Sequence, residues 1–147
     1  MSKLLQALLS GMFITFLLDF SIFLGIKLNY IDFYEIDVYY NILFADNQDI
    51  FLYSAFTLFL GYLVVYLDKT KITLITLSVL FLLSFSTLFH QVGYSAGEML
   101  FMQKNVILKN SRHKFIGDIY YDGRDVITFY DYELKKIILL NKKELIQ

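Results

Sequence analysis

Long uncharged stretches alternate with short polar ones along the first two thirds of the chain. Three stretches, residues 4–26, 50–67 and 72–91, contain a single charged residue, Asp19. A bilayer core of about 30 Å takes roughly 20 residues of helix, and backbone groups in hydrocarbon must be hydrogen-bonded within their own segment. The pattern therefore predicts three transmembrane α-helices within residues 1–102, the third extending without a helix breaker to about Met102.

Two other interpretations of these stretches are less consistent with the sequence. Buried helices of a water-soluble protein would need more polar surface than this chain offers, since 57% of its 147 residues are hydrophobic. A cleaved signal peptide would end in a small-x-small motif, which the first stretch lacks, and that stretch contains Asp19. We therefore expect a retained first span and an integral membrane protein.

The polar connections predict how the spans are arranged. The connection Asp-Lys-Thr-Lys at 68–71 is short enough for a tight antiparallel hairpin of the second and third spans. The connection 28–49 is acidic and aromatic, which suits the membrane surface, and a short interfacial helix is expected over 33–44. Three spans place this connection and the C-terminal region on the same side. The acids of the connection are Asp32, Glu35, Asp37, Asp46 and Asp49, with no Lys or Arg between them.

The C-terminal region, 103–147, has the pattern of strands. Ile127 and Phe129 alternate with side chains of the opposite face, and Asp122-Gly123 is a hairpin-turn pair. The predicted fold class is therefore membrane α+β: three transmembrane helices followed by a small antiparallel β-meander, of which an SH3-like arrangement is one form. The strands are expected at 105–109, 114–121, 125–131 and 136–140, and a helical turn at 142–146.

This tail is too small to be stable without help. An unstapled domain of about 40 residues rarely folds alone, and the chain contains no cysteine. One face of its last strand can pack in the tail's own core, while the other needs a cover from the connection 28–49, a second copy or a partner. From Lys104 onward the tail is about +3, so it should attract the acidic connection. The predicted interaction surface comprises Asp32, Glu35, Asp37, Ile137, Ile138, Leu139 and Leu140.

Small residues mark the predicted helix-packing faces. Ala7, Gly11, Thr15 and Asp19 recur at every fourth position, a spacing that lets a second helix approach closely. Gly61 is a further packing residue on the second span. Gly93 and Gly97 form a GxxxG pair, which is either a packing face or a bend where the chain leaves the membrane.

Asp19 is the first candidate functional residue, because an ionisable group inside a membrane is costly and marks a paired contact or a pathway. It would be protonated, or bond to a hydroxyl of another span such as Tyr53, Ser54 or Thr87, or else move protons or ions. His90, at the same predicted membrane side, is the candidate partner in a proton-linked pair, since histidine titrates near neutral pH.

The sequence contains no motif of catalysis, metal binding or phosphate binding, so we expect no enzyme, no cofactor and no metal. The modest, mixed charge of the tail also predicts no nucleic-acid partner. The leading hypothesis is an accessory or structural subunit of a membrane complex, with a protein partner or further copies of itself. The alternative is an oligomeric ion or proton channel that uses Asp19. The composition is typical of small bacterial inner-membrane proteins, and the basic turn 68–71 favours a cytoplasmic N terminus and a periplasmic tail.

Overall fold

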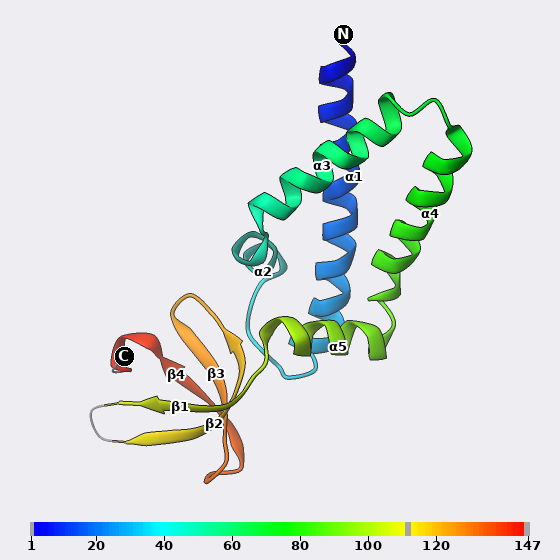
Figure 1. Cartoon of the computed structure of the whole chain (residues 1–147). Helices are drawn as coiled ribbons and strands as arrows, with labels where there is room; N and C mark the ends of the chain where they lie inside the picture. The colour runs from blue at the N-terminus through cyan, green and yellow to red at the C-terminus, as the bar shows by residue number, and fades with distance from the viewer. Residues whose placement is uncertain (1, 111–112, 146–147) are drawn as a thin grey trace.

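The computed structural model describes residues 2–110 and 113–145, which form a helical region and a four-stranded sheet (Figure 1). The N terminus lies at the end of α1 that points away from the sheet. The helices are α1 (Lys3–Ile26), which continues into a π-helical turn (Lys27–Ile31), α2 (Tyr40–Asn47), α3 (Ile50–Val65), α4 (Thr70–Ser86) and α5 (His90–Phe101). The strands are β1 (Gln103–Lys109), β2 (Lys114–Asp122), β3 (Val126–Asp131) and β4 (Lys136–Asn141).

One helix of the described chain is by itself long and apolar enough to cross a membrane. It is α1 with its π-helical extension, 29 residues in all. The second and third predicted spans meet the same criterion only as bent helix pairs, α2 with α3 and α4 with α5, with bends of 85° and 84°. The described chain therefore has one candidate span, or three if each bent pair counts as one.

The third uncharged run is not one straight helix, contrary to the prediction that it continues to Met102. It breaks between α4 and α5, at a site without proline or glycine. A helix end leaves carbonyl groups without partners. The side-chain amide of Asn29, at the end of α1, donates to the carbonyl oxygens of Thr87 and Leu88 at 3.1 and 3.2 Å. The break is thus stabilised in part by α1, together with the Ser86 and Thr87 hydroxyls, which donate to carbonyl oxygens of the last turn of α4.

The second and third runs also do not form the predicted tight hairpin. Each of α3 and α4 packs on α1, and the two scarcely contact one another (Figure 1). Backbones meet closely between α1 and α3, where a Cβ placed on Gly61 would lie 2.2 Å from the carbonyl oxygen of Ala7. On α4, the Ser84 hydroxyl donates to the carbonyl oxygen of Leu18 at 2.6 Å. Because α1 supplies packing sites for both helices, they separate along its length.

The sheet confirms the predicted antiparallel meander, with the strand order β1-β2-β3-β4. The predicted hairpin turn follows Asp122, and the Gly123 amide donates to the Val126 carbonyl oxygen at 3.1 Å. Ile127 and Phe129 are buried in the tail's own core with Ile119, as the alternation predicts. The last helical turn covers Lys142–Glu144, and the predicted Ile146 lies outside the described residues.

The SH3-like arrangement of the tail stays a prediction. One isolated bridge, between Asn110 and Leu145, places the end of β1 beside the segment that follows β4. The two edge strands are therefore drawn together at one end of the sheet.

A β-bulge in β2 turns one tyrosine towards the helical region. Ile119 pairs with Phe129, but Tyr121 pairs with Thr128, so one extra residue lies between them. A bulge of this kind reverses the alternation of the strand. Tyr121 consequently lies on the outer face of the sheet, opposite to the tail's own core, and only 5% of its surface is exposed.

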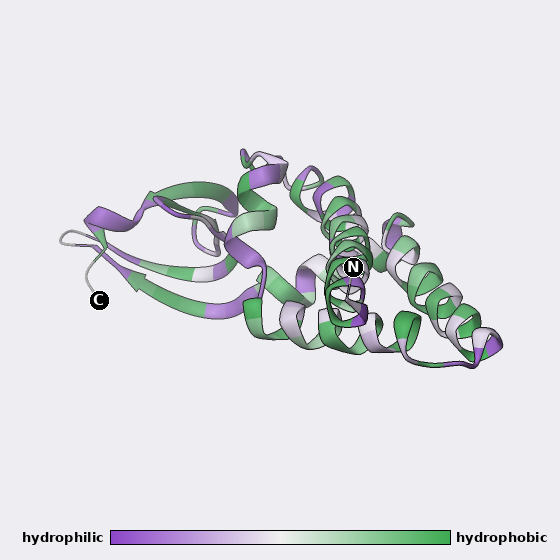
Figure 2. Cartoon of the chain, turned by 90° about the horizontal axis from the view of Figure 1, so that it is seen from above, coloured by the Kyte–Doolittle hydropathy of each residue, from purple (hydrophilic) through white to green (hydrophobic). Residues whose placement is uncertain are grey.

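The helical region and the sheet meet in a buried cluster that we call the junction core. The connection after α1 contributes to it, although the predicted helix over 33–44 begins only at Tyr40, after a turn in which Glu35 has a positive φ of 53°. Figure 2 shows the hydrophobic colour continuing from the helices to this junction. The cluster consists of Phe23, Ile26, Tyr30, Ile31, Ile36, Leu43, Phe101 and Tyr121.

Candidate functional site

Two hollows of the described chain are the candidate binding sites, and a smaller one of about 240 Å³ lies between the first half of α1 and α3. The first, the surface groove, has a volume of about 410 Å³ and lies between residues 35–42 and the outer face of the sheet. The second, the helix cleft, has a volume of about 310 Å³ and lies among α1, α3 and α4. They are separate, since no residue lines both.

The surface groove has apolar walls and a charged rim. Ile36, Val38 and Ile42 line it from the connection, and Tyr121, Val126 and Leu139 from the sheet. Leu139 of β4 lines the groove with 70% of its surface exposed. The charged groups of the rim are Glu35, Asp37, Arg124 and Asp125.

Hydrogen bonds, a ring contact and an ion pair join the connection 28–49 to the tail. The Tyr30 hydroxyl donates to the carbonyl oxygen of Tyr120 at 2.8 Å, and the rings of Tyr34 and Tyr120 lie 4.1 Å apart between centroids. The Arg124 guanidinium binds Asp46 of α2 through two nitrogens, with Nε at 2.7 Å from Oδ2. The two walls of the groove are thus parts of one continuous surface.

The residues of the predicted interaction surface divide between different environments. Glu35 and Asp37 line the groove, while Asp32 pairs with Lys27 instead. Ile138 and Leu140 pack against the tail's own core, whereas Ile137 and Leu139 of the same strand are exposed. The strand therefore has one covered face and one partly open face, and the opening on the second face is the groove.

The Arg124–Asp46 pair gives the connection its dependence on pH. The hydrogen bond from Arg124 holds the pKa of the Asp46 carboxyl below its ordinary value of 3.8. A depressed pKa in the folded state means that the pair stabilises the contact above the ordinary value, and that this contribution is lost as the pH falls through the lower, folded value. At neutral pH the Asp46 carboxyl is therefore in the charged form that pairs with Arg124.

Replacing Arg124 by glutamine should loosen α2 from the tail without unfolding either. Both groups of the pair are exposed, and exposed pairs contribute little, so we expect amide exchange in α2 to rise by a few-fold at most. Hydrogen exchange followed by mass spectrometry measures this. Lys142→Gln is the matched control, because it removes an exposed pair with Asp122 inside the tail. Equal exchange rates in both variants would contradict the role assigned to Arg124.

The helix cleft contains the predicted residue Asp19, but not with the predicted partners. Its carboxylate accepts a hydrogen bond from the side-chain amide of Gln48, with 3.2 Å between Nε2 and Oδ2. Tyr53, Ser54 and Thr87 use their hydroxyls on backbone carbonyl oxygens, of Met12, Ile50, and both Ser21 and Ser84 respectively. The expectation of a hydroxyl partner was wrong, because each candidate hydroxyl finds a carbonyl on its own helix or on α1.

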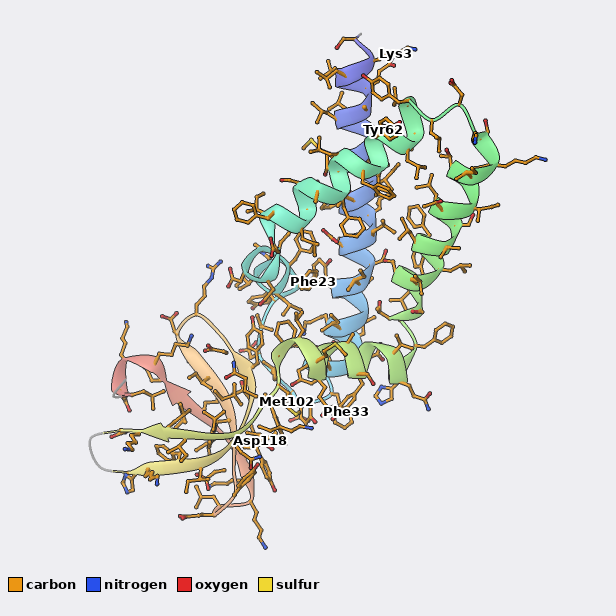
Figure 3. All side chains as sticks on the ribbon, in the orientation of Figure 1. Lys3, Phe23, Phe33, Tyr62, Met102 and Asp118 are labelled. Carbon is orange, nitrogen blue, oxygen red and sulfur yellow. The ribbon has the colours of Figure 1, made fainter. Side chains whose placement is uncertain are left out.

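His90 and Asp19 have different neighbours. His90 begins α5, and its ring lies 5.9 Å from that of Phe33 and 6.0 Å from that of Tyr94. Figure 3 shows Phe33 below α5, and Met102 where α5 passes into the sheet. The structure thus gives the proposed proton-linked pair no direct contact, and His90 belongs to an aromatic group at the junction.

The predicted packing glycines lie at close helix contacts. A Cβ on Gly11 would lie 2.0 Å from the carbonyl oxygen of Thr57, so α1 and α3 touch through backbone. Ala7 and Thr15 are buried along the same contact, with 7% and 2% of their surfaces exposed. On α5, a Cβ on Gly93 would lie 2.8 Å from the Gly25 carbonyl oxygen, and one on Gly97 would lie 2.3 Å from the ring of Tyr30.

Four residues that organise these sites were not identified from the sequence: Gln48, Asn29, Tyr30 and Arg124. Gln48 and Asn29 are polar residues in or beside the acidic connection, and only their position in the fold gives them partners. Tyr30 is one of several tyrosines there, and its complete burial had no signal in the sequence. Arg124 was counted only as part of the positive charge of the tail.

Comparison of the chain with known protein families, with curated proteins and with solved structures gives no match. Among the described residues, no group of three or more His, Asp or Glu side chains could hold a metal ion.

Proposed function

We propose that the chain is an accessory subunit of a membrane complex, and that the connection 28–49 and the tail together form its partner-binding surface. The observation that carries this proposal is the surface groove, with walls from both segments and an exposed leucine on one of them. The proposed location is a bacterial inner membrane, with the N terminus in the cytoplasm and the tail in the periplasm.

In this proposal α1, α3 and α4 are the three membrane spans. The helices α2 and α5 lie near the membrane surface that is closer to the sheet. Large apolar side chains of α3 and α4 point outward: Phe51 is 85% exposed and Leu82 is 71% exposed. Exposing such apolar side chains to water is unfavourable, whereas the acyl chains of a bilayer would cover them. The bends of 85° and 84° support a surface position for α2 and α5.

The chemistry of the groove indicates the kind of partner. An apolar hollow with few polar groups favours a partner that inserts apolar side chains. The rim bears three acids, Glu35, Asp37 and Asp125, and its one basic group, Arg124, is already paired with Asp46. A peptide segment with apolar side chains and flanking Lys or Arg residues complements this arrangement.

The test is purification from native membranes in a mild detergent, with stoichiometry determined by mass spectrometry. The unaltered chain should purify with a partner at a fixed ratio. Leu139→Glu, which places a charge in the groove, should remove most of that partner. Ile107→Glu is the matched control, because Ile107 is also exposed but lies on β1, away from the groove.

Two results would contradict the proposal. In one, both variants retain the partner equally, which would show that the groove is not the binding surface. In the other, the chain purifies alone as a defined homo-oligomer. That result would favour the alternative function of an ion or proton channel, for which the loss of flux in Asp19→Asn is the direct measurement.

A further inference from the structure

The helix cleft lies within the uncharged region formed by α1, α3 and α4, and it opens beside α1, between α3 and α4. Its floor includes Thr15 and Asp19 of α1. Its walls are apolar, and Leu52 of α3 and Leu83 of α4 are 59% and 63% exposed. The cleft lies where α3 and α4 both pack on α1 and scarcely contact each other.

The floor of the cleft holds polar groups whose bonding capacity is not used. Among the described residues, the Asp19 carboxylate accepts one hydrogen bond, from Gln48, although an ionised carboxylate accommodates about four. The Thr15 hydroxyl is buried with only 2% of the residue exposed, and it has no hydrogen-bond partner in the described part of the chain. By contrast, the hydroxyls of Ser84 and Thr87 in the same cleft donate to backbone carbonyl oxygens.

An unsatisfied acceptor in an apolar layer favours a donor, and a carboxylate favours a cation. This chain cannot supply one from its own spans, because residues 4–26, 50–67 and 72–91 contain no Lys or Arg. The nearest cation along α1, Lys27, is paired with Asp32. The spans of a second copy would therefore bring apolar side chains, hydroxyl groups such as that of the exposed Tyr62, and another Asp19, but no cation to pair with the carboxylate. An acyl chain would fill the space but offer no donor.

We propose that the cleft receives one transmembrane helix of a different protein, and that this helix carries a Lys or Arg that pairs with Asp19. The apolar flanks of that helix would cover Leu52 and Leu83, and its cationic side chain would reach the floor of the cleft. The inference rests on the membrane placement of α1, α3 and α4 proposed above. The contact itself is separate from the surface groove and would add a second interface within the membrane.

The test uses synthetic transmembrane peptides and the full chain reconstituted in phosphatidylcholine vesicles. The host peptide is an apolar helix of leucine and alanine. One version carries a single Lys at the depth of Asp19, and the control carries Leu there. Binding is measured by energy transfer between labelled peptide and labelled protein. We expect the Lys peptide to bind about tenfold more tightly than the Leu peptide, because one polar contact between membrane helices contributes a free energy that corresponds to a factor of about this size.

Variants of the chain test whether the preference for the Lys peptide depends on the cleft. Asp19→Asn should abolish the preference for Lys, while Asp68→Asn, in the turn between α3 and α4, should keep it. The Asn variant preserves the shape of the side chain. Hydrogen exchange of α1 shows whether the purified variant is folded. Equal binding of the two peptides, or a Lys preference that survives in Asp19→Asn, would overturn the proposal.

A lipid occupant gives a distinct result. A fluorophore on Leu83→Cys would be quenched by brominated acyl chains to the same extent with and without the Lys peptide. That outcome would also overturn the proposal, because it shows that the peptide does not displace lipid from the cleft. We expect the Lys peptide to relieve the quenching and the Leu peptide to leave it unchanged.

Discussion

Replacing Tyr30 by alanine is expected to separate the sheet from the helices and to lower the free energy of unfolding by about 4 kcal/mol. Tyr30 has no exposed surface and lies at the centre of the junction core. Its ring contacts those of Tyr34, Tyr94 and Phe101, at centroid distances of 5.2, 5.8 and 6.1 Å. Removing it leaves a cavity where α1, α5 and the connection meet.

The Tyr30 prediction is measured by unfolding in mixed detergent micelles, with hydrogen exchange of the sheet as a second readout. Tyr30→Phe keeps the ring and removes only the hydrogen bond to the Tyr120 carbonyl oxygen, so it should cost about 1–2 kcal/mol. Tyr39→Ala removes a tyrosine that is 73% exposed and should have little effect on stability. If Tyr30→Ala were no worse than Tyr30→Phe, the junction core would not hold the two regions together.

Replacing Gly61 by alanine should push α3 away from α1 and cost about 3 kcal/mol, the upper end of the usual range for overpacking. The added methyl group would lie 2.2 Å from the carbonyl oxygen of Ala7 and 2.8 Å from its carbonyl carbon. Backbone atoms cannot rotate away, so the helices themselves must move. Alanine favours helix over glycine by about 1 kcal/mol, which offsets part of the loss but not all of it.

The matched control for Gly61→Ala is Ala55→Val on the same helix. Ala55 is exposed, so added methyl groups there meet the surroundings of the helix instead of α1. The free energy of unfolding in mixed micelles should fall for Gly61→Ala and change little for Ala55→Val. The same loss in both variants would mean that the close contact of α1 and α3 is not the source of the effect.

The tail could be predicted from the sequence because its signals are local. Ile127 and Phe129 alternate with residues of the other face, and Asp122-Gly123 marks the turn, so neighbouring residues decide the strands and their order. The bulge that moves Tyr121 to the outer face has no such signal. It depends on the junction core, which offers a buried place for this side chain.

The helical region could be predicted only in outline, because its decisive contacts join distant residues. An uncharged run does not show where α4 ends, since an amide that stabilises the break belongs to Asn29, on another helix. A four-residue turn suggests a hairpin, yet α3 and α4 separate because α1 offers glycine and carbonyl sites to both. Likewise, the charges of connection and tail predict attraction but not the pairing of Asp46 with Arg124.

In the proposed arrangement, three spans place the connection 28–49 and the tail on one side of a membrane. The chain has no cysteine, so single cysteines can be introduced and labelled with a membrane-impermeant maleimide. We expect Glu35→Cys and Lys136→Cys to be labelled from the same side of sealed vesicles, and Asp68→Cys to be labelled only from the other side. Labelling of all three cysteines from one side would show that α3 and α4 do not cross the membrane, and would rule out this arrangement.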